Sequence, residues 1–129
     1  MAISVVRLGS PRQPGEGTRI GTVRRPPRGV KKSDFSRLDY YDVWLPDLAP
    51  GAQLLSWANA EEMTAARWKR FARDYRREMK EPAAERLIVL LAAMSAGSDF
   101  SVGCYCDDET RCHRGILREL LAEAGAVMR

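Results

Sequence analysis

The chain has 129 residues, of which 45% are apolar and 29% charged, and its net charge is +4. A chain of this size builds one hydrophobic core, so we expect a single domain over residues 1–129. No apolar run is long enough to cross a membrane, and the first residues do not resemble a secretory leader, so we expect neither a membrane partner nor export. The chain has three cysteines, an odd number that does not suit a disulfide framework. We therefore expect free thiols and a cytoplasmic protein.

The positive charge is concentrated near the N-terminus. Residues 1–37 carry Glu16 and Asp34 as their only acids, against the basic residues Arg7, Arg12, Arg19, Arg24, Arg25, Arg28, Lys31, Lys32 and Arg37. Such a segment is typical of a surface that binds phosphate, nucleotide or nucleic acid, but it can equally be a solvated surface that keeps a protein in solution. Both interpretations stay open on composition alone.

Two short β-branched runs near the N-terminus predict strands. Residues 3–8 (ISVVRL) end at a Gly-Ser-Pro turn. Residues 18–23 (TRIGTV) end at RRPPRG, whose prolines have no N–H to donate to a sheet. The arginines of RRPPRG should therefore leave the end of a strand on a stiff loop. Residues 38–46 (LDYYDVWLP) mix aromatic and β-branched side chains, and we expect them to be extended.

Two segments in the middle of the chain predict helices. Asn59, followed three residues later by Glu62, resembles an N-cap, so we expect a helix from there to about Lys80. One stripe of that helix is apolar, which is typical of a face that packs on a core, and it consists of Trp68, Phe71, Ala72, Tyr75 and Met79. A second helix should begin at Pro82 and end before Gly97, and it should be largely buried because it is apolar around most of its circumference.

A strand and a helix close the chain. Residues 99–106 (DFSVGCYC) predict a strand, the polar stretch DDET a loop, and residues 111–125 a helix that Gly125 ends. Helix, buried strand and helix in succession are typical of layered folds with parallel sheets. We therefore predict an α/β fold, with one small layered domain, a mostly parallel sheet of about four strands and helices packed on it.

The stretch GCYCDDETRCHR at residues 103–114 contains every cysteine and the only histidine of the chain. In parallel sheets, ligands bind beyond the carboxyl ends of strands, beside the free N–H groups of the following helix, and this stretch occupies such a place. On the predicted helix, Cys112 and His113 fall on the apolar face, so the His113 ring should point toward the sheet and the crevice above it. His113 is then either a hydrogen-bonded packing residue or part of a site.

A metal site and a thiol nucleophile are alternative interpretations of the same stretch. The three cysteines and His113 are zinc-ligand types, but Cys112 and His113 diverge on a helix and C-x-C lacks the knuckle of C-x₂-C, so we predict no metal. Cys106 and Arg111 have roughly the spacing of phosphatase and rhodanese loops, although the acidic DDE between them would repel phosphate. Cys112, beside a helix N-terminus, is the better candidate for an activated thiol, and its position equally suits a buried, inert cysteine.

Anion binding is the interpretation that we favour. Arg24, Arg28 and Arg114 would supply guanidinium groups from two neighbouring strand ends, with Arg25 on the same loop as Arg24 and Arg28. Cys104 lies beside them as a further ligand-binding candidate. The ligand would be a phosphate-bearing or otherwise anionic molecule, such as a nucleotide or nucleic acid, and we predict no cofactor.

The residues of this site do not distinguish an enzyme from a binding protein. In an enzyme, His113 would be the general acid or base and Cys112 a candidate nucleophile. The alternative is a non-catalytic nucleic-acid or protein-binding module that uses the basic N-terminal segment, with the triplet Cys112-His113-Arg114 serving only to hold the helix on the sheet.

Three blocks of the chain resemble a known family. They are TVRRPPRGVKKSDF (22–35), LAPGAQLLSW with WKRFARDYRREM (48–79), and VGCYCDDETRCHRGILRELL (102–121). Together they resemble the bacterial family called domain of unknown function 488 (DUF488), particularly its YeaO-like branch. The residues that match its pattern are Arg24, Pro27, Arg28, Gly29, Trp68, Phe71, Tyr75, Cys104, Cys112, His113 and Arg114. The chain departs from the pattern at Thr22, where many members have aspartate, and at Cys106, where many have glutamate. The resemblance implies a small α/β fold with a site at the triplet, and no particular reaction.

Overall fold

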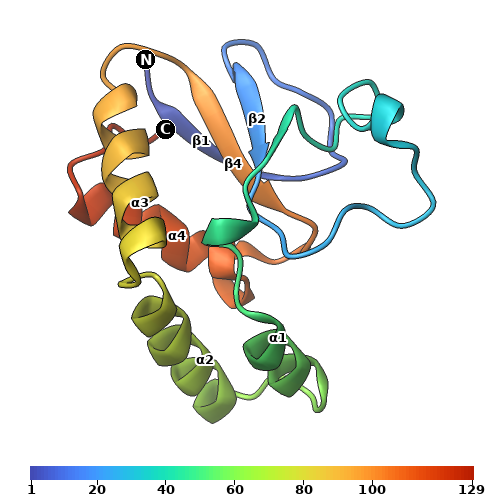
Figure 1. Cartoon of the computed structure of the whole chain (residues 1–129), viewed down its shortest axis with the longest axis vertical. Helices are drawn as coiled ribbons and strands as arrows, with labels where there is room; N and C mark the ends of the chain where they lie inside the picture. Colours follow the sequence, from blue (N-terminus) through green and yellow to red (C-terminus); the bar gives the residue numbers. More distant parts are fainter.

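The strands form one short parallel sheet. A computed structural model describes residues 1–129 of the chain. Its four strands are arranged in the order β1-β4-β2-β3, and every neighbouring pair is parallel (Figure 1). They are β1 (Ile3–Arg7), β2 (Thr18–Gly21), β3 (Val43–Trp44) and β4 (Phe100–Cys104). The predicted α/β fold with a parallel sheet is therefore confirmed.

The helices lie beside the sheet and beyond one end of it. They are α1 (Ala52–Asn59), α2 (Ala65–Glu78), α3 (Pro82–Met94) and α4 (His113–Glu123). Figure 1 shows α3 and α4 next to each other along the sheet, whereas α1 and α2 lie past the carboxyl ends of β2 and β4. None of these helices is long and apolar enough to pass through a membrane.

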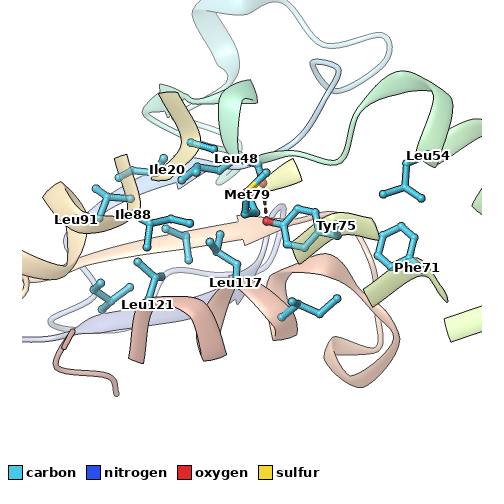
Figure 2. Packing of buried hydrophobic residues seen from close by; sticks show 14 of the residues in the cluster. Ile20, Leu48, Leu54, Phe71, Tyr75, Met79, Ile88, Leu91, Leu117 and Leu121 are labelled. Carbon is cyan, nitrogen blue, oxygen red and sulfur yellow. Dashed lines mark hydrogen bonds between the residues drawn. The ribbon is translucent and has the colours of Figure 1, made fainter. Parts of the chain in front are cut away.

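One face of the sheet packs on the helices and forms the main core. Alternate residues of β2 and β4, namely Ile20, Phe100 and Val102, are buried in one apolar cluster with residues of all four helices. Figure 2 shows part of this cluster, with Ile88 and Leu91 of α3, Leu117 and Leu121 of α4, and Ile20 of β2. Burial of this face is what holds the helices on the sheet.

The aromatic stripe of α2 belongs to this core, as its spacing predicts. Phe71, Tyr75 and Met79 are buried, and Trp68 is half-buried against them. The Tyr75 hydroxyl donates a hydrogen bond of 2.7 Å to the carbonyl oxygen of Leu48, drawn as a dashed line in Figure 2. A buried phenol needs such a partner, so the stripe is a packing feature rather than a ligand site.

Loops cover the opposite face of the sheet. Arg19 on β2 points to this face, is fully buried, and donates from Nε to Glu16 Oε1 at 2.6 Å. Its Nη1 donates to the carbonyl oxygens of Ser10 and Asp39, at 2.8 and 2.6 Å. Glu16 also accepts a hydrogen bond of 3.1 Å from Ser101 on β4. This buried ion pair therefore ties two loops to the two central strands.

Two sequence predictions of local structure are wrong. Asn59 is not the N-cap of the aromatic helix but the last residue of α1, a helix that the sequence analysis missed. Thr64 caps α2, and its hydroxyl accepts from the Arg67 N–H at 3.2 Å. A threonine closer to the aromatic stripe thus takes the capping role. Within LDYYDVWLP only β3 is a strand, because the chain first turns through Asp39 with φ at 64°.

We expect Arg19→Met to lower the free energy of unfolding by about 3–5 kcal/mol, because it leaves the Glu16 carboxylate buried without its cation. Urea unfolding followed by circular dichroism measures this. The matched control is Arg37→Met, which removes an exposed pair with Asp34 and should cost under about 1 kcal/mol. Equal effects of the two substitutions would contradict the structural importance of the buried pair.

Candidate functional site

The junction between β4 and α4 positions the histidine. Cys112 has an extended backbone and is the N-cap of α4, so His113 is the first residue of the helix. His113 is only 6% exposed, and its Nε2 lies 2.6 Å from the carbonyl oxygen of Thr22. A carbonyl oxygen can only accept, so Nε2 carries the proton and Nδ1 keeps a lone pair, which faces the Cys112 Sγ at 3.9 Å. The predicted orientation of the ring toward the sheet is correct.

The protonation state of His113 follows from its surroundings. Its ring packs against Tyr75, with 5.5 Å between the ring centroids. Burial lowers the pKa of His113 to about 4, although the hydrogen bond to Thr22 opposes this shift. At neutral pH the imidazole is therefore uncharged, with Nδ1 as the only ring atom able to accept a proton.

Arg114 holds the loop that precedes the helix. Its side chain is buried, and Nη1 donates to the carbonyl oxygen of Cys106 and, at 3.5 Å, to that of Cys104. The sequence analysis groups Arg114 with the ligand-binding arginines, but in the structure its guanidinium binds the loop. Arg114 therefore shapes the site and adds positive charge behind it.

The three cysteines converge, which the sequence analysis did not predict. Their Sγ atoms lie within 4.8 Å of one another, and those of Cys104 and Cys112 are 2.8 Å apart. Cys104 and Cys112 are buried, whereas Cys106 is exposed. Three thiols so arranged could hold a soft metal ion. They leave a tetrahedral ion one ligand short, and the absence of a metal stays a prediction.

The acidity of these thiols differs because they share hydrogen bonds. Hydrogen bonds from the thiols of Cys104 and Cys112 lower the pKa of Cys106, and the charge of Arg114 acts in the same direction. Hydrogen bonds to its two neighbours, together with burial, raise the pKa of Cys112. Hydrogen bonding to Cys106 also raises the pKa of Cys104. These directions make Cys106 the most acidic thiol of the cluster and Cys112 the one that most retains its proton.

A cavity of about 890 Å³ opens at the carboxyl ends of β2 and β4. Its walls come from the loop after β2, from α1 and from the end of β4, and its lining contains three arginines and no carboxylate. The predicted site residues that line it are Arg24, Arg28, Cys104 and His113. Cys112 and Arg114 are buried and do not line it. The structure thus brings four of the predicted residues to one cavity and places two behind it.

The arginines of RRPPRG have different roles. Arg24 donates from Nε to Pro50 O at 3.1 Å, and from Nη2 to two further carbonyl oxygens of the segment before α1. Arg24 therefore holds the loop after β2, which forms one wall of the cavity, against the segment before α1, which forms another. Arg25 and Arg28 are exposed, line the cavity and belong to none of the ion pairs of the structure. Their guanidinium groups are free to bind a ligand.

Some lining residues were missed by the sequence analysis. Arg25 is not one of them, because the sequence analysis already places it at the end of the second strand with Arg24 and Arg28. Tyr40 and Tyr105 carried no signal, since they come together only in the fold, with ring centroids 6.3 Å apart. Cys106 was set aside because of the acidic residues that follow it.

Those acidic residues do not face the cavity. Asp107 pairs with Arg7 at 2.9 Å, and Glu109 pairs with an arginine of α4 at 2.8 Å. Asp108 accepts a hydrogen bond of 2.9 Å from the N–H of Thr110 and begins the next turn. The repulsion that the sequence predicts between the DDE stretch and an anion is therefore weakened at this cavity.

The fold and the cavity together define a small parallel α/β domain with an arginine-lined pocket at the carboxyl ends of its strands. The chain belongs to the DUF488 family, because residues 3–125 match the sequence model described as the active DUF488-N3 subclade. The match confirms the family-level resemblance, and the YeaO-like branch stays a prediction. No curated protein and no solved structure matches the chain.

We expect the stability of the protein to fall as the pH drops from about 6.5 toward about 4. In this window the unfolded chain protonates His113 while the folded chain does not, so the unfolded state binds the extra proton. A shift of this size corresponds to about 3 kcal/mol. Urea midpoints measured between these pH values test the expectation.

The control for this measurement is His113→Gln, which keeps an N–H donor for the Thr22 carbonyl but does not titrate. We expect its stability to change less with pH over the same window. Parallel pH profiles of the two proteins would show that His113 is not the group responsible.

Proposed function

We propose that the protein binds a phosphate-bearing or otherwise anionic ligand of nucleotide size in the pocket beside His113. The observation that carries this proposal is the lining, which has three arginines and no carboxylate. A cavity of about 890 Å³ is within the range of small-molecule sites. Guanidinium groups bind phosphate oxygens bidentately, so such a lining favours anions over neutral ligands.

The residues of the pocket suggest how such a ligand would be held. Arg25 and Arg28 would bind its phosphate groups, since their side chains are exposed and unpaired. Tyr105 donates a hydrogen bond of 2.9 Å from its hydroxyl to the carbonyl oxygen of Arg25, which fixes this part of the loop. The rings of Tyr40 and Tyr105 offer an apolar surface for a base or another flat group.

Catalysis is a further part of the proposal. An uncharged His113 with an unprotonated Nδ1 suits a general base better than a general acid, because its only proton is bound to the Thr22 carbonyl. The arginines would stabilise charge that develops on a phosphate. Cys112 is a weak nucleophile candidate, since it is buried and its pKa is raised.

A non-catalytic nucleic-acid-binding module is the second candidate. What favours it is that Lys31 and Lys32 are exposed beside Arg25 and Arg28 on the same loop. The bonds from His113 to Thr22 and from Arg114 to Cys106 also suit a triplet that only holds α4 in place. The rest of the basic segment argues against a broad patch, because Arg7, Arg12, Arg19 and Arg37 are paired with acids.

A cytoplasmic location belongs to the same proposal. All three cysteines are free thiols, which fits a reducing compartment.

We expect a nucleoside triphosphate to bind the protein more tightly than the corresponding nucleoside, and Arg28→Gln to weaken its binding about tenfold through loss of a charge-assisted contact. Isothermal titration calorimetry with the two ligands measures both effects. The matched control is Lys31→Gln, which removes a charge from the same loop outside the pocket lining. Raising the salt concentration should also weaken triphosphate binding.

Other outcomes would decide between the two candidates. Equal affinity for the nucleoside and its triphosphate would overturn the anion site. Tight binding of a single-stranded oligonucleotide, weakened as much by Lys31→Gln as by Arg28→Gln, would favour the nucleic-acid module. A His113→Gln protein that binds the triphosphate normally would leave His113 a packing residue.

A further inference from the structure

We propose that the three cysteines form a thiol oxidation site, in which Cys106 reacts with a hydroperoxide and the oxidation is passed to a disulfide between Cys104 and Cys112. This proposal goes beyond ligand binding in the pocket and does not depend on it. Its basis is the convergence of the thiols together with the difference in their exposure.

The buried thiols of Cys104 and Cys112 lie close enough to form a disulfide bond. Cys104 ends β4, and Cys112 precedes α4, so their side chains come from two elements that pack together. Their Sγ atoms are 2.8 Å apart, and a disulfide bond is about 2.05 Å long, so a small movement closes the bond. The Cys106 N–H donates to Cys104 Sγ at 3.4 Å, which holds the third residue against the pair.

Exposure decides which thiol an oxidant meets first. Cys104 and Cys112 are 3% and 2% exposed, so solvent barely reaches them. Cys106 is exposed and lines the arginine-rich cavity. A hydroperoxide that enters the cavity therefore meets the sulfur of Cys106.

The surroundings of Cys106 favour the reactive thiolate form. Its Sγ lies within 4.8 Å of the other two sulfur atoms, whose S–H groups can donate to it. The guanidinium of Arg114 is bound to the Cys106 carbonyl oxygen and places a positive charge nearby. The lowered pKa of Cys106 and the raised pKa of Cys112 are consistent with this division. A thiolate attacks peroxides and a thiol does not, so only Cys106 is prepared for the first step.

The reaction balances with a hydroperoxide as the oxidant. The Cys106 thiolate attacks the outer oxygen, the O–O bond breaks, and Cys106 sulfenic acid and an alkoxide form. The Cys112 thiol then attacks the sulfenic sulfur, which gives a Cys106–Cys112 disulfide and water. Finally, the alkoxide takes the proton of the Cys104 thiol and becomes the alcohol, and the resulting Cys104 thiolate attacks the Cys112 sulfur, which forms the Cys104–Cys112 disulfide and releases the Cys106 thiolate. Overall, two thiols lose two electrons and two protons, and the hydroperoxide becomes an alcohol and water, or two waters from hydrogen peroxide.

The experiment is titration of the full-length, reduced protein with hydrogen peroxide, followed by alkylation, trypsin digestion and tandem mass spectrometry. Cleavage after Arg111 separates Cys112 from the other two cysteines, so a disulfide to Cys112 links two peptides. We expect the linked partner to be Cys104, with Cys106 alkylated. Cys106→Ser replaces an exposed side chain, and it should slow formation of this disulfide at least tenfold because the oxidant loses its point of attack. In Cys112→Ala we expect Cys106 sulfenic acid to accumulate, as measured by dimedone labelling.

Several results would overturn the proposal. One is an equal oxidation rate in the wild-type and Cys106→Ser proteins, which would mean that the buried pair is oxidised directly. Another is wild-type protein in which Cys106 proceeds to sulfinic acid while Cys112 stays reduced. A stoichiometric metal ion that holds the three sulfurs in the purified protein, measured by elemental analysis, would make the cluster a metal site instead.

Discussion

The hydrogen bond between His113 and Thr22 fixes the geometry on which the rest of the site depends. The Thr22 carbonyl oxygen accepts from His113, while the Thr22 N–H and hydroxyl both donate to the carbonyl oxygen of Gly103, each at 3.0 Å. One fully buried residue thus joins the ends of β2 and β4 to the first turn of α4. Gly103 is required there, because a Cβ atom would lie 2.6 Å from the Val6 carbonyl oxygen on β1. Any movement of α4 would break this arrangement before it altered the pocket.

The molecule has arginines that hold loops in place and arginines that are free to bind a ligand. Arginines that hold loops are bound to carboxylates or carbonyl oxygens, as Arg19 is to Glu16 and Arg24 is to the segment before α1. Arg25 and Arg28, by contrast, belong to no ion pair and lie on the loop after β2, where they line the pocket. A net charge of +4 would not predict this, because total charge does not separate structural arginines from available ones. Pairing of the acids elsewhere is what leaves the pocket positive.

Periodicity predicted the parts of the protein that depend on local spacing. The spacing of apolar residues along α4 predicted that His113 points inward, and the β-branched runs predicted β1 and β2. Both predictions were possible because they depend only on residues that are close in the sequence. The convergence of the three thiols depends instead on the loop of residues 105–112. There, a short 3₁₀ turn and an extended Cys112 bring the chain back to the end of β4. A helical model of Cys112 could not place its sulfur beside Cys104.

Tertiary contacts explain two features that the sequence did not predict, namely the direction of the Arg114 side chain and the burial of Arg19 on the loop-covered face. Arg114 lies at the edge of the apolar face of α4, where it could turn toward either the crevice or the loop. The carbonyl oxygen of Cys106, which lies beyond the end of β4, binds it to the loop, together with the Cys104 carbonyl oxygen, which also accepts from the Leu8 N–H at 2.8 Å. Likewise, Arg19 has its ion-pair partner Glu16 three residues away, but the contacts with Asp39 and with Ser101, which binds Glu16, come from distant parts of the chain.

The thiol cluster and the pocket are physically linked, because Cys106 belongs to both. The lowered pKa of Cys106 in the reduced protein favours a negative charge on a wall that otherwise carries arginines. A Cys104–Cys112 disulfide would remove the two S–H donors that stabilise this thiolate, so the pKa of Cys106 would rise and its charge would be lost. The oxidised pocket would then be more positive and would bind an anion more tightly. By linkage, a bound anion would favour the disulfide form to the same extent, so ligand affinity and thiol oxidation would each report on the other.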